Sequence, residues 1–232
     1  PVIMLSDGYL GNGAEPWKVP DLAEIPRIDP RFATEPNTTA ADGSPRFMPY
    51  RRDPQTLARP WALPGTKGLE HRVGGLEKSA HTGAISYDPT NHEEMVATRA
   101  AKVKGIAKTI PPTAVDDPSG DADVLVLGWG SAYGPITAAV RRVRARGLSI
   151  AQAHVRHLNP LPEDLGDVLR RYRQVVVPEM NTGQFAMLLR SKYLIDVKAI
   201  SRVRGLPIPP VDLCDELCRH CGGKGSDDMR EA

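Results

Sequence analysis

The sequence contains no apolar run approaching the roughly 20 residues that a membrane-spanning helix needs. Its opening run, Pro1–Leu5, is too short for a secretory signal and lacks a basic region before it. The 30 Lys and Arg residues nearly balance the 28 Asp and Glu residues, and a net charge of +2 argues against a dedicated nucleic-acid binder. The three cysteines, an odd number near the C-terminal end, cannot form a disulfide framework. These absences predict a cytoplasmic protein that binds neither membranes nor nucleic acid.

Proline and glycine are abundant instead, with 22 and 21 residues, and many precede residue 121. We expect Val2–Leu5 to be the last strand of a domain, and Gly11–Trp17 to lack regular structure. Prolines recur from Pro20 to Pro64, which favours an extended arm that is ordered only against a neighbour. Asn91–Ala107 has the pattern of a helix with an apolar flank of Val96, Ala100, Val103 and Ala107, and Pro111–Gly120 that of a linker. Because the chain lacks an initial methionine, we expect it to be part of a longer protein.

The second half alternates between apolar runs and helical patterns. The first run has no polar alternation, which is typical of a strand covered on both faces of a parallel sheet. Each run is followed by a turn and a helix, so the repeat predicts an α/β fold with a mostly parallel, doubly wound sheet and right-handed crossovers. The four expected strands are Val124–Leu127, Leu148–Val155, Gln174–Val177 and Ile195–Val203.

Three loops are expected along the carboxyl edge of this sheet: Gly128–Gly134, Arg156–Pro162 and Pro178–Gln184. Each precedes a helix N-terminus, where an anion is favoured. The glycines of the first loop resemble a dinucleotide fingerprint, but their spacing is one residue too long, and no acid ends the second strand. An NAD(P)-binding domain is therefore a weaker alternative, and a hydrolase based on Ser131 is weaker still.

Polar residues in the third loop have two possible roles. Glu179, Asn181 and Gln184 could cap the helix that follows them, or they could contact a ligand directly. The sequence alone leaves both interpretations open.

Two earlier segments, Arg46–Arg52 and Arg59–Thr66, mix arginine with aromatic residues. In one interpretation Phe47, Tyr50 and Trp61 anchor the arm on a partner domain, while the arginines pair with surface acids. In the other, an arginine of this region receives a carboxylate or a phosphate, for which its fork is suited.

Cys214, Cys218 and Cys221 fall on one face if residues 211–220 are helical. Their C-x₃-C-x₂-C spacing also occurs among iron–sulfur cluster ligands, which makes metal binding an alternative. The simpler expectation is a helix that frays at a glycine-rich tail, in which the cysteines have no special role. The histidines at 71 and 81 lie among glycines, and no cysteine or acid lies at metal-ligand spacing from them. A metal site at these histidines is therefore not expected.

The ordered series of motifs resembles the alpha subunits of 2-oxoacid:ferredoxin oxidoreductases, in particular those for 2-oxoglutarate. Ser-Asp-Gly-Tyr-Leu and Glu-Pro-Trp within Pro1–Asp21 resemble the end of the pyrimidine-binding domain. Arg59–Gly75 and Gly83–Arg99 resemble the segment that follows it. Gly-Trp-Gly-Ser, His-Leu-Asn-Pro-Leu-Pro and Glu-Met-Asn-Thr-Gly-Gln within Asp123–Pro207 are similar to a transketolase C-terminal-like domain. The resemblance extends to about Pro210 and implies four parts: residues 1–25, 26–120, 121–210 and an atypical tail, 211–232.

The resemblance implies oxidative decarboxylation of a 2-oxoacid on thiamine diphosphate, transfer of the acyl group to coenzyme A, and reduction of ferredoxin. Thiamine diphosphate, Mg²⁺ and the iron–sulfur cluster are expected mainly outside this chain, partly on a beta subunit, so the chain alone is expected to be inactive. Arg59 and Thr66 are the implied contacts to the 2-oxoacid. Ser131, Asn181 and Gln184 are implied to face coenzyme A or a subunit interface. The alternative function is a non-catalytic assembly or dimerisation module.

Overall fold

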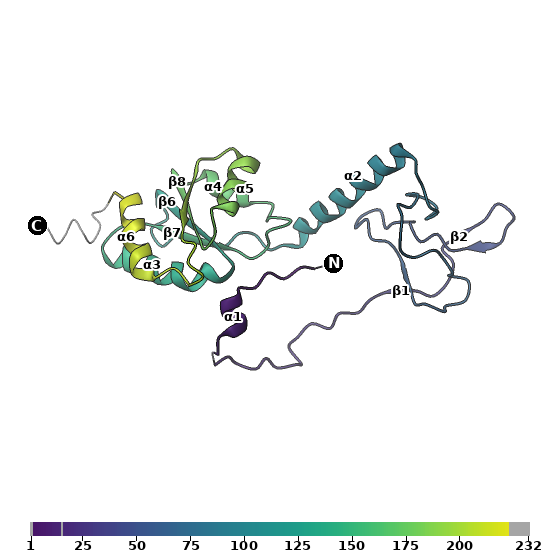
Figure 1. Ribbon diagram of the computed structural model, residues 1–232, viewed down its shortest axis with the longest axis horizontal. Coiled ribbons are helices and arrows are strands. Elements are labelled where there is room, and N and C mark those ends of the chain that lie inside the picture. Colours follow the sequence, from purple (N-terminus) through teal and green to yellow (C-terminus); the bar gives the residue numbers. More distant parts are fainter. Residues whose placement is uncertain (1, 15, 223–232) are drawn as a thin grey trace, which may run out of the picture. The chain divides into compact units, whose positions relative to one another are not determined.

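The computed structural model describes residues 2–14 and 16–222. The chain divides into two units, residues 1–16 with 108–232 and residues 17–107, and each is described by itself. The larger unit contains the five-stranded sheet labelled in Figure 1 by β6, β7 and β8.

The sheet has the strand order β5-β7-β6-β8-β9. All neighbouring pairs among β6, β7, β8 and β9 are parallel, which confirms the predicted α/β architecture. The short β5 pairs antiparallel with β7, within a segment for which the sequence predicts only a linker. The strands are β5 (Val115–Asp116), β6 (Val124–Trp129), β7 (Ala151–Val155), β8 (Gln174–Glu179) and β9 (Val197–Ser201).

Helices cover both faces of this sheet, as a doubly wound fold requires. Leu125 and Leu127 of β6 point into a core formed with α4 and α5, while Val124 and Val126 point into a second core formed with α3 and α6. The alternation explains why the whole strand is apolar, and Figure 1 shows α3 and α6 together on one face. The helices are α3 (Tyr133–Ala145, after the 3-10 turn η2, Gly130–Ala132), α4 (Leu165–Arg170), α5 (Gln184–Tyr193) and α6 (Pro210–His220).

The unit of residues 17–107 has little regular structure besides one helix. Its strands are two residues long: β1 (Phe32–Ala33) pairs with β4 (Trp61–Ala62), and β2 (Thr38–Thr39) pairs with β3 (Pro45–Arg46). The helix α2 spans Pro89–Gly105, and the 3-10 helix η1 (Ile106–Thr109) follows it.

Asparagine side chains replace missing backbone partners in this smaller unit. The Asn37 amide donates to the Met48 carbonyl at 3.0 Å and accepts from the Met48 N–H at 2.8 Å. Asn91 of α2 likewise accepts from the Ala80 N–H and donates to the Lys78 carbonyl. These paired bonds hold irregular loops where no ladder is available.

The predicted apolar flank of α2 is wrong. Met95 is the buried residue of the helix, at 3% exposure, whereas Val96 and Val103 are 48% and 38% exposed. The helix contacts its unit through the flank that carries Met95, where Arg52 reaches the Met95 sulfur at 3.6 Å. Weak amphipathicity explains the error, because both flanks contain apolar residues and only tertiary contacts choose between them.

The expected strand at Val2–Leu5 is also absent. These residues have no regular structure, and all four side chains are more than 60% exposed. A short helix, α1 (Gly8–Asn12), follows instead, and its last two residues fall in the region Gly11–Trp17 that was expected to be irregular. Among the described residues, no helix is long and apolar enough to cross a membrane.

Candidate functional site

The carboxyl edge of the sheet brings the three predicted loops together. Trp129 at the end of β6 lies in register with Val155 at the end of β7, and β8 ends with Glu179 on the other side of β6. The helices after β6 and β8 lie on opposite faces, so the chain directions diverge between these two strands. Open α/β sheets bind ligands at such a point.

Gly128 of β6 leaves room at this edge for its neighbours. A Cβ at Gly128 would lie 2.7 Å from Ile136 Cδ1 and 3.0 Å from His154 Nδ1. The His154 ring packs edge-on against Tyr133 at 5.1 Å, and burial, followed by the charge of Arg156, lowers the pKa of His154. Its Nδ1 is buried without a hydrogen-bond partner among the described residues. Sequence reasoning missed His154, although a histidine within an otherwise buried strand was visible.

Ser131, expected at the ligand-facing edge, lies in the 3-10 turn after β6 and is partly exposed. Its hydroxyl donates to the Asp7 carboxylate of the N-terminal segment. The structure thus gives this side chain a partner within the chain, one that the sequence did not indicate.

Glu179 and Asn181 cap the N-terminus of α5. The buried Glu179 carboxylate accepts from the Phe185 and Ala186 N–H groups, both at 3.0 Å. Asn181 Oδ1 accepts from the N–H groups of Gly183 and Gln184 at 2.7 and 3.3 Å. Both side chains therefore act as caps, and these four amides are not free to receive a phosphate.

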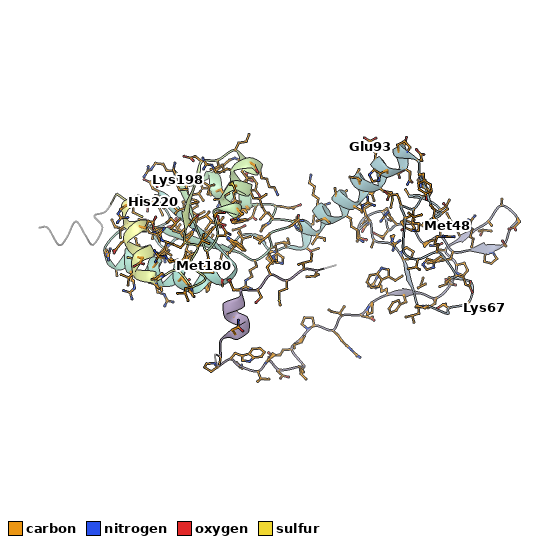
Figure 2. The ribbon with its side chains drawn as sticks, in the orientation of Figure 1. Met48, Lys67, Glu93, Met180, Lys198 and His220 are labelled. Carbon is orange, nitrogen blue, oxygen red and sulfur yellow. The ribbon has the colours of Figure 1, made fainter. Side chains whose placement is uncertain are left out.

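Gln184 and Thr182 of the loop before α5 are exposed, whereas Met180 and Asn181 are half-buried and Gly183 is buried. Gln184 is exposed at the first position of the helix, and Met180, labelled in Figure 2, follows the buried glutamate. Of the three residues predicted to face a ligand or an interface, Gln184 has the most exposed side chain.

The unit of residues 17–107 contains an open hollow of about 560 Å³. Arg51, Arg52 and Tyr50 contribute to its wall, and Glu94 and His81 also line it. Met48, labelled in Figure 2, also lies in this wall. The lining residues are Thr38, Met48, Tyr50, Arg51, Arg52, Leu57, Ala80, His81, Glu94 and Thr98.

Arg52 and Arg59 share the ring of Tyr50. The Arg59 guanidinium carbon lies 4.3 Å from the ring centroid and that of Arg52 lies 5.6 Å away, both within cation–π range. Burial, followed by the positive charge of Arg59, lowers the pKa of Arg52. Among the described residues, neither arginine forms an ion pair, contrary to the expectation that arginines here pair with surface acids.

The aromatic residues of these segments have different environments. Phe47 is buried and packs edge-on against His71 at 5.2 Å, within its own unit. Trp61 is 61% exposed and lies 6.5 Å from Phe32. Phe47 thus packs within its own unit, and the anchoring of the three aromatic residues on a partner domain stays a prediction.

Thr66 is not among the residues that line the hollow. Its hydroxyl donates to the Leu63 carbonyl at 2.9 Å, within a turn that the Thr66 N–H also closes. Arg59 and Thr66, predicted as a pair, are therefore placed by different local contacts, one on an aromatic ring and one in a turn.

The C-terminal cysteines belong to the core, so the expectation of a fraying helix is wrong. The helix α6 packs on α3, and Cys214 and Cys218 are completely buried. Arg146 at the end of α3 donates to Asp215 at 2.8 Å and to the Cys218 sulfur at 3.3 Å. Burial raises the pKa of Cys214 and of Cys221 to about 11, so both remain protonated at neutral pH.

Protonated, buried thiols are poor metal ligands, because a metal binds the thiolate. Within the described part of the chain, no group of three or more His, Cys, Asp or Glu side chains is placed to hold a metal ion. The histidines of residues 17–107 have other partners: His92 bonds Glu77, and His71 Nδ1 contacts the Leu69 carbonyl at 2.7 Å.

Comparison with known proteins identifies close relatives. Residues 122–215 match the family described as pyruvate:ferredoxin oxidoreductase core domain II. The chain is 53% identical over 219 residues, 94% of its length, to the 2-oxoglutarate oxidoreductase subunit KorA of Mycobacterium tuberculosis, and covers 31% of that protein. It is 31% identical over 195 residues, 82% of its length, to the alpha subunit of 2-oxoacid:ferredoxin oxidoreductase 1 of Aeropyrum pernix, and covers 29% of it. The chain thus spans about a third of the length of these relatives.

A solved structure is also similar to this chain. The 2-oxoglutarate:ferredoxin oxidoreductase of Magnetococcus marinus, with 2-oxoglutarate, coenzyme A and succinyl-CoA bound, superimposes with a TM-score of 0.70 at 29% identity. The alignment covers 80% of this chain and 32% of that one.

Proposed function

The chain is homologous to the alpha subunits of 2-oxoacid:ferredoxin oxidoreductases, and we propose that it contributes the corresponding part of such an enzyme. The observation that carries the proposal is the 53% identity over 94% of the chain to a 2-oxoglutarate oxidoreductase subunit. The proposed reaction is oxidative decarboxylation of a 2-oxoacid, with 2-oxoglutarate as the first choice, to an acyl-CoA with reduction of ferredoxin. The proposed location is the cytoplasm.

We propose residues 1–25 as the end of the pyrimidine-binding domain, 26–120 as arm and linker, 121–210 as the transketolase C-terminal-like domain, and 211–232 as a tail. The exposure of Val2–Leu5 supports the first assignment. Four consecutive apolar side chains, each more than 60% exposed, form a surface that a further domain would cover.

Arg59 is proposed to bind the 2-oxoacid carboxylate, and Thr66 to supply a hydroxyl nearby. The support for Arg59 is its place on Tyr50, which holds the guanidinium in position without neutralising it. Ser131, Asn181 and Gln184 are proposed to face coenzyme A or a subunit interface. Gln184 has an exposed side chain for this role, whereas Ser131 would exchange its bond to Asp7.

Thiamine diphosphate, when bound, would stabilise the carbanion left by decarboxylation. The described residues do not fit the diphosphate at α5, because Glu179 and Asn181 occupy the amides there. They do not fit an iron–sulfur cluster at α6, because Cys214 and Cys218 are completely buried and burial raises the pKa values of Cys214 and Cys221 to about 11. We therefore propose that the beta subunit and other parts of the complex hold these groups and Mg²⁺, and that the residues of this chain bind and orient substrate.

The test is reconstitution of the complete alpha subunit, containing this chain, with its beta subunit. Reduction of ferredoxin that requires both 2-oxoglutarate and coenzyme A would support the proposal. Arg59→Ala should raise the Michaelis constant for 2-oxoglutarate about tenfold or more, the range for loss of a charge-assisted bond. An unchanged Michaelis constant in Arg59→Ala would refute the role of Arg59. Lack of activity of the reconstituted complex with any 2-oxoacid would refute the proposed function.

A non-catalytic assembly module is the second candidate. The observation that favours it is the exposed flank of α2, where Val96 and Val103 are 48% and 38% exposed. The test is a complex assembled with a variant of this chain in which Arg59 and Gln184 are both replaced by alanine. Full specific activity of that complex would favour this alternative.

A further inference from the structure

The helix α2 has two flanks that could pack against other elements, and the flank with Met95 is the one that its own unit covers. The other flank consists of Val96, Ala100 and Val103, at positions i, i+4 and i+7, and all three residues are exposed. We call these three residues the outer seam. Apolar residues that alternate in steps of four and three are typical of a helix that lies along a second helix. The outer seam therefore has the spacing for a helical partner.

The charges beside the outer seam have opposite signs at its two ends. Glu93, labelled in Figure 2, precedes Val96 by three residues, and Lys104 directly follows Val103. Because an α-helix turns by about 100° per residue, Glu93 and Lys104 project from the same side of the seam. Neither takes part in an ion pair among the described residues.

The charges on the other side of the seam already have partners within the chain. Arg99 donates to the Glu77 carboxylate at 3.0 Å, and His92 contacts the same carboxylate. The charges still available to a partner of the outer seam are therefore one acid near the start of the helix and one base near its end.

We propose that the outer seam of α2 pairs with the outer seam of a second copy of this chain, with the two helices antiparallel about a twofold axis near Ala100. Val96 of one copy then lies next to Val103 of the other. Glu93 lies within about one helical turn of Lys104 of the second copy, and the symmetry creates this ion pair twice. The small side chain of Ala100 allows the two helices to approach closely at the axis.

The charges also select the antiparallel orientation over the parallel one. A parallel pair would place Glu93 beside Glu93 and Lys104 beside Lys104, and like charges at these positions repel each other. The helix dipoles oppose a parallel pair as well, because ends of the same sign would meet. The second copy is thus a partner whose charges match those that the outer seam presents.

Charge reversal tests the orientation. Glu93→Lys changes both attractions into repulsions and should weaken dimerisation about tenfold, as should Lys104→Glu. The variant with both substitutions restores two attractive pairs and should return to within about threefold of the unchanged chain. Glu94→Lys is the matched control, because it changes the net charge equally, but Glu94 lies beside His81 at 3.8 Å and away from the seam. It should change dimerisation less than about twofold.

A cysteine at the axis tests the contact itself. In the presence of oxidised glutathione, which takes up the two electrons, Ala100→Cys should form a disulfide-linked dimer at least about fivefold faster than Ala101→Cys. Both alanines are exposed, but Ala101 lies about 100° further round the helix, so it is the matched control. The unchanged chain measures the background from Cys221, which is half-buried.

Sedimentation equilibrium of the complete chain measures dimerisation. A seam of three residues predicts a weak dimer, with a dissociation constant on the order of 10–100 µM. The proposal would be overturned by a chain that stays monomeric in this range, by equal effects of Glu93→Lys and Glu94→Lys, by a double variant without recovery, or by equal linking of the two cysteine variants. Circular dichroism checks that each variant keeps its helical content, which is expected because every substituted position is exposed.

This inference rests on the second candidate function above, the assembly module, and names its partner. A chain that stays monomeric would overturn the inference and leave the activity of the reconstituted complex untouched. Conversely, a dimer that responds to Glu93 and Lys104 would stand even if the reconstituted complex were inactive.

Discussion

Replacing Glu179 with alanine tests the cap that closes the N-terminus of α5. The Glu179 carboxylate is 1% exposed and accepts two amide bonds of 3.0 Å. Glu179→Ala leaves two buried N–H groups unsatisfied, at about 1–3 kcal/mol each, and removes a charge that favours the helix dipole by about 0.5–1 kcal/mol. Burying the carboxylate itself costs free energy, and the alanine variant no longer has this cost. This offsets part of the loss, so we expect the free energy of unfolding to fall by about 3 kcal/mol.

Glu179→Gln keeps one acceptor oxygen and should lose about 1–2 kcal/mol. Glu163→Ala, at an exposed position before α4, is the control and should change stability by less than about 0.5 kcal/mol. The order of the three losses is a stronger test than any single value. It distinguishes a variant that loses both amide hydrogen bonds from one that keeps one acceptor and from one that loses neither.

Urea unfolding followed by tryptophan fluorescence can report on this unit alone. The chain has three tryptophans, and Trp129 packs against Phe185 of α5 at 5.9 Å. With Trp17 and Trp61 changed to phenylalanine, Trp129 remains as the reporter. Hydrogen exchange at the Phe185 amide should accelerate in Glu179→Ala. A variant with unchanged stability and unchanged exchange would refute the cap, and with it the argument that α5 has no amides free for a diphosphate.

Three further predictions address packing, thiol chemistry and pH. Gly128→Ala places a methyl group 2.7 Å from a side chain of α3 and should cost about 1–3 kcal/mol, measured by thermal unfolding, and an unchanged melting temperature would contradict the close packing. Cys214 and Cys221, with pKa values raised to about 11, should react with Ellman's reagent at pH 8 much more slowly in the folded chain than in urea, and equal rates would contradict their burial. Hydrogen bonds from His92 and then Arg99 lower the pKa of Glu77 from 4.5, so its stabilisation is complete above about pH 4.5 and is lost as the pH falls through the folded-state value. Glu77→Gln should flatten the acid side of the stability curve from urea midpoints, and an identical curve would show that this contact contributes nothing.

The sheet could be predicted from the sequence because its causes are local. An apolar run such as Val124–Leu127 needs cover on both faces, and the turn and helix pattern after it leaves few topologies. Val124, Val155 and Val176 do lie on adjacent parallel strands, which confirms the expectation on which the edge of three loops rests. The two-residue β5 was missed because its pairing with β7 supplies most of its order.

The errors share a different physical origin. The sequence did not identify the flank of α2 that carries Met95 as the buried one. The reason is that Met95 contacts Arg52, which is 43 residues away in the chain. The burial of α6 was not expected because a glycine-rich tail follows it, whereas its cover comes from α3. Arg52 and Arg59 both approach the ring of Tyr50, and the chain between them contains Leu57 at a φ of 55°, which the sequence does not indicate. Long-range contacts decided each case.

The packing of α6 on α3 has a practical consequence for handling the protein. The match to core domain II ends at residue 215, inside α6, while Leu217 and Cys218 beyond it are completely buried. A chain shortened at the family boundary would strip the last turns from α6 and uncover Val140 and Val143. The exposed apolar surface would promote aggregation during purification. A truncated protein should therefore end after His220.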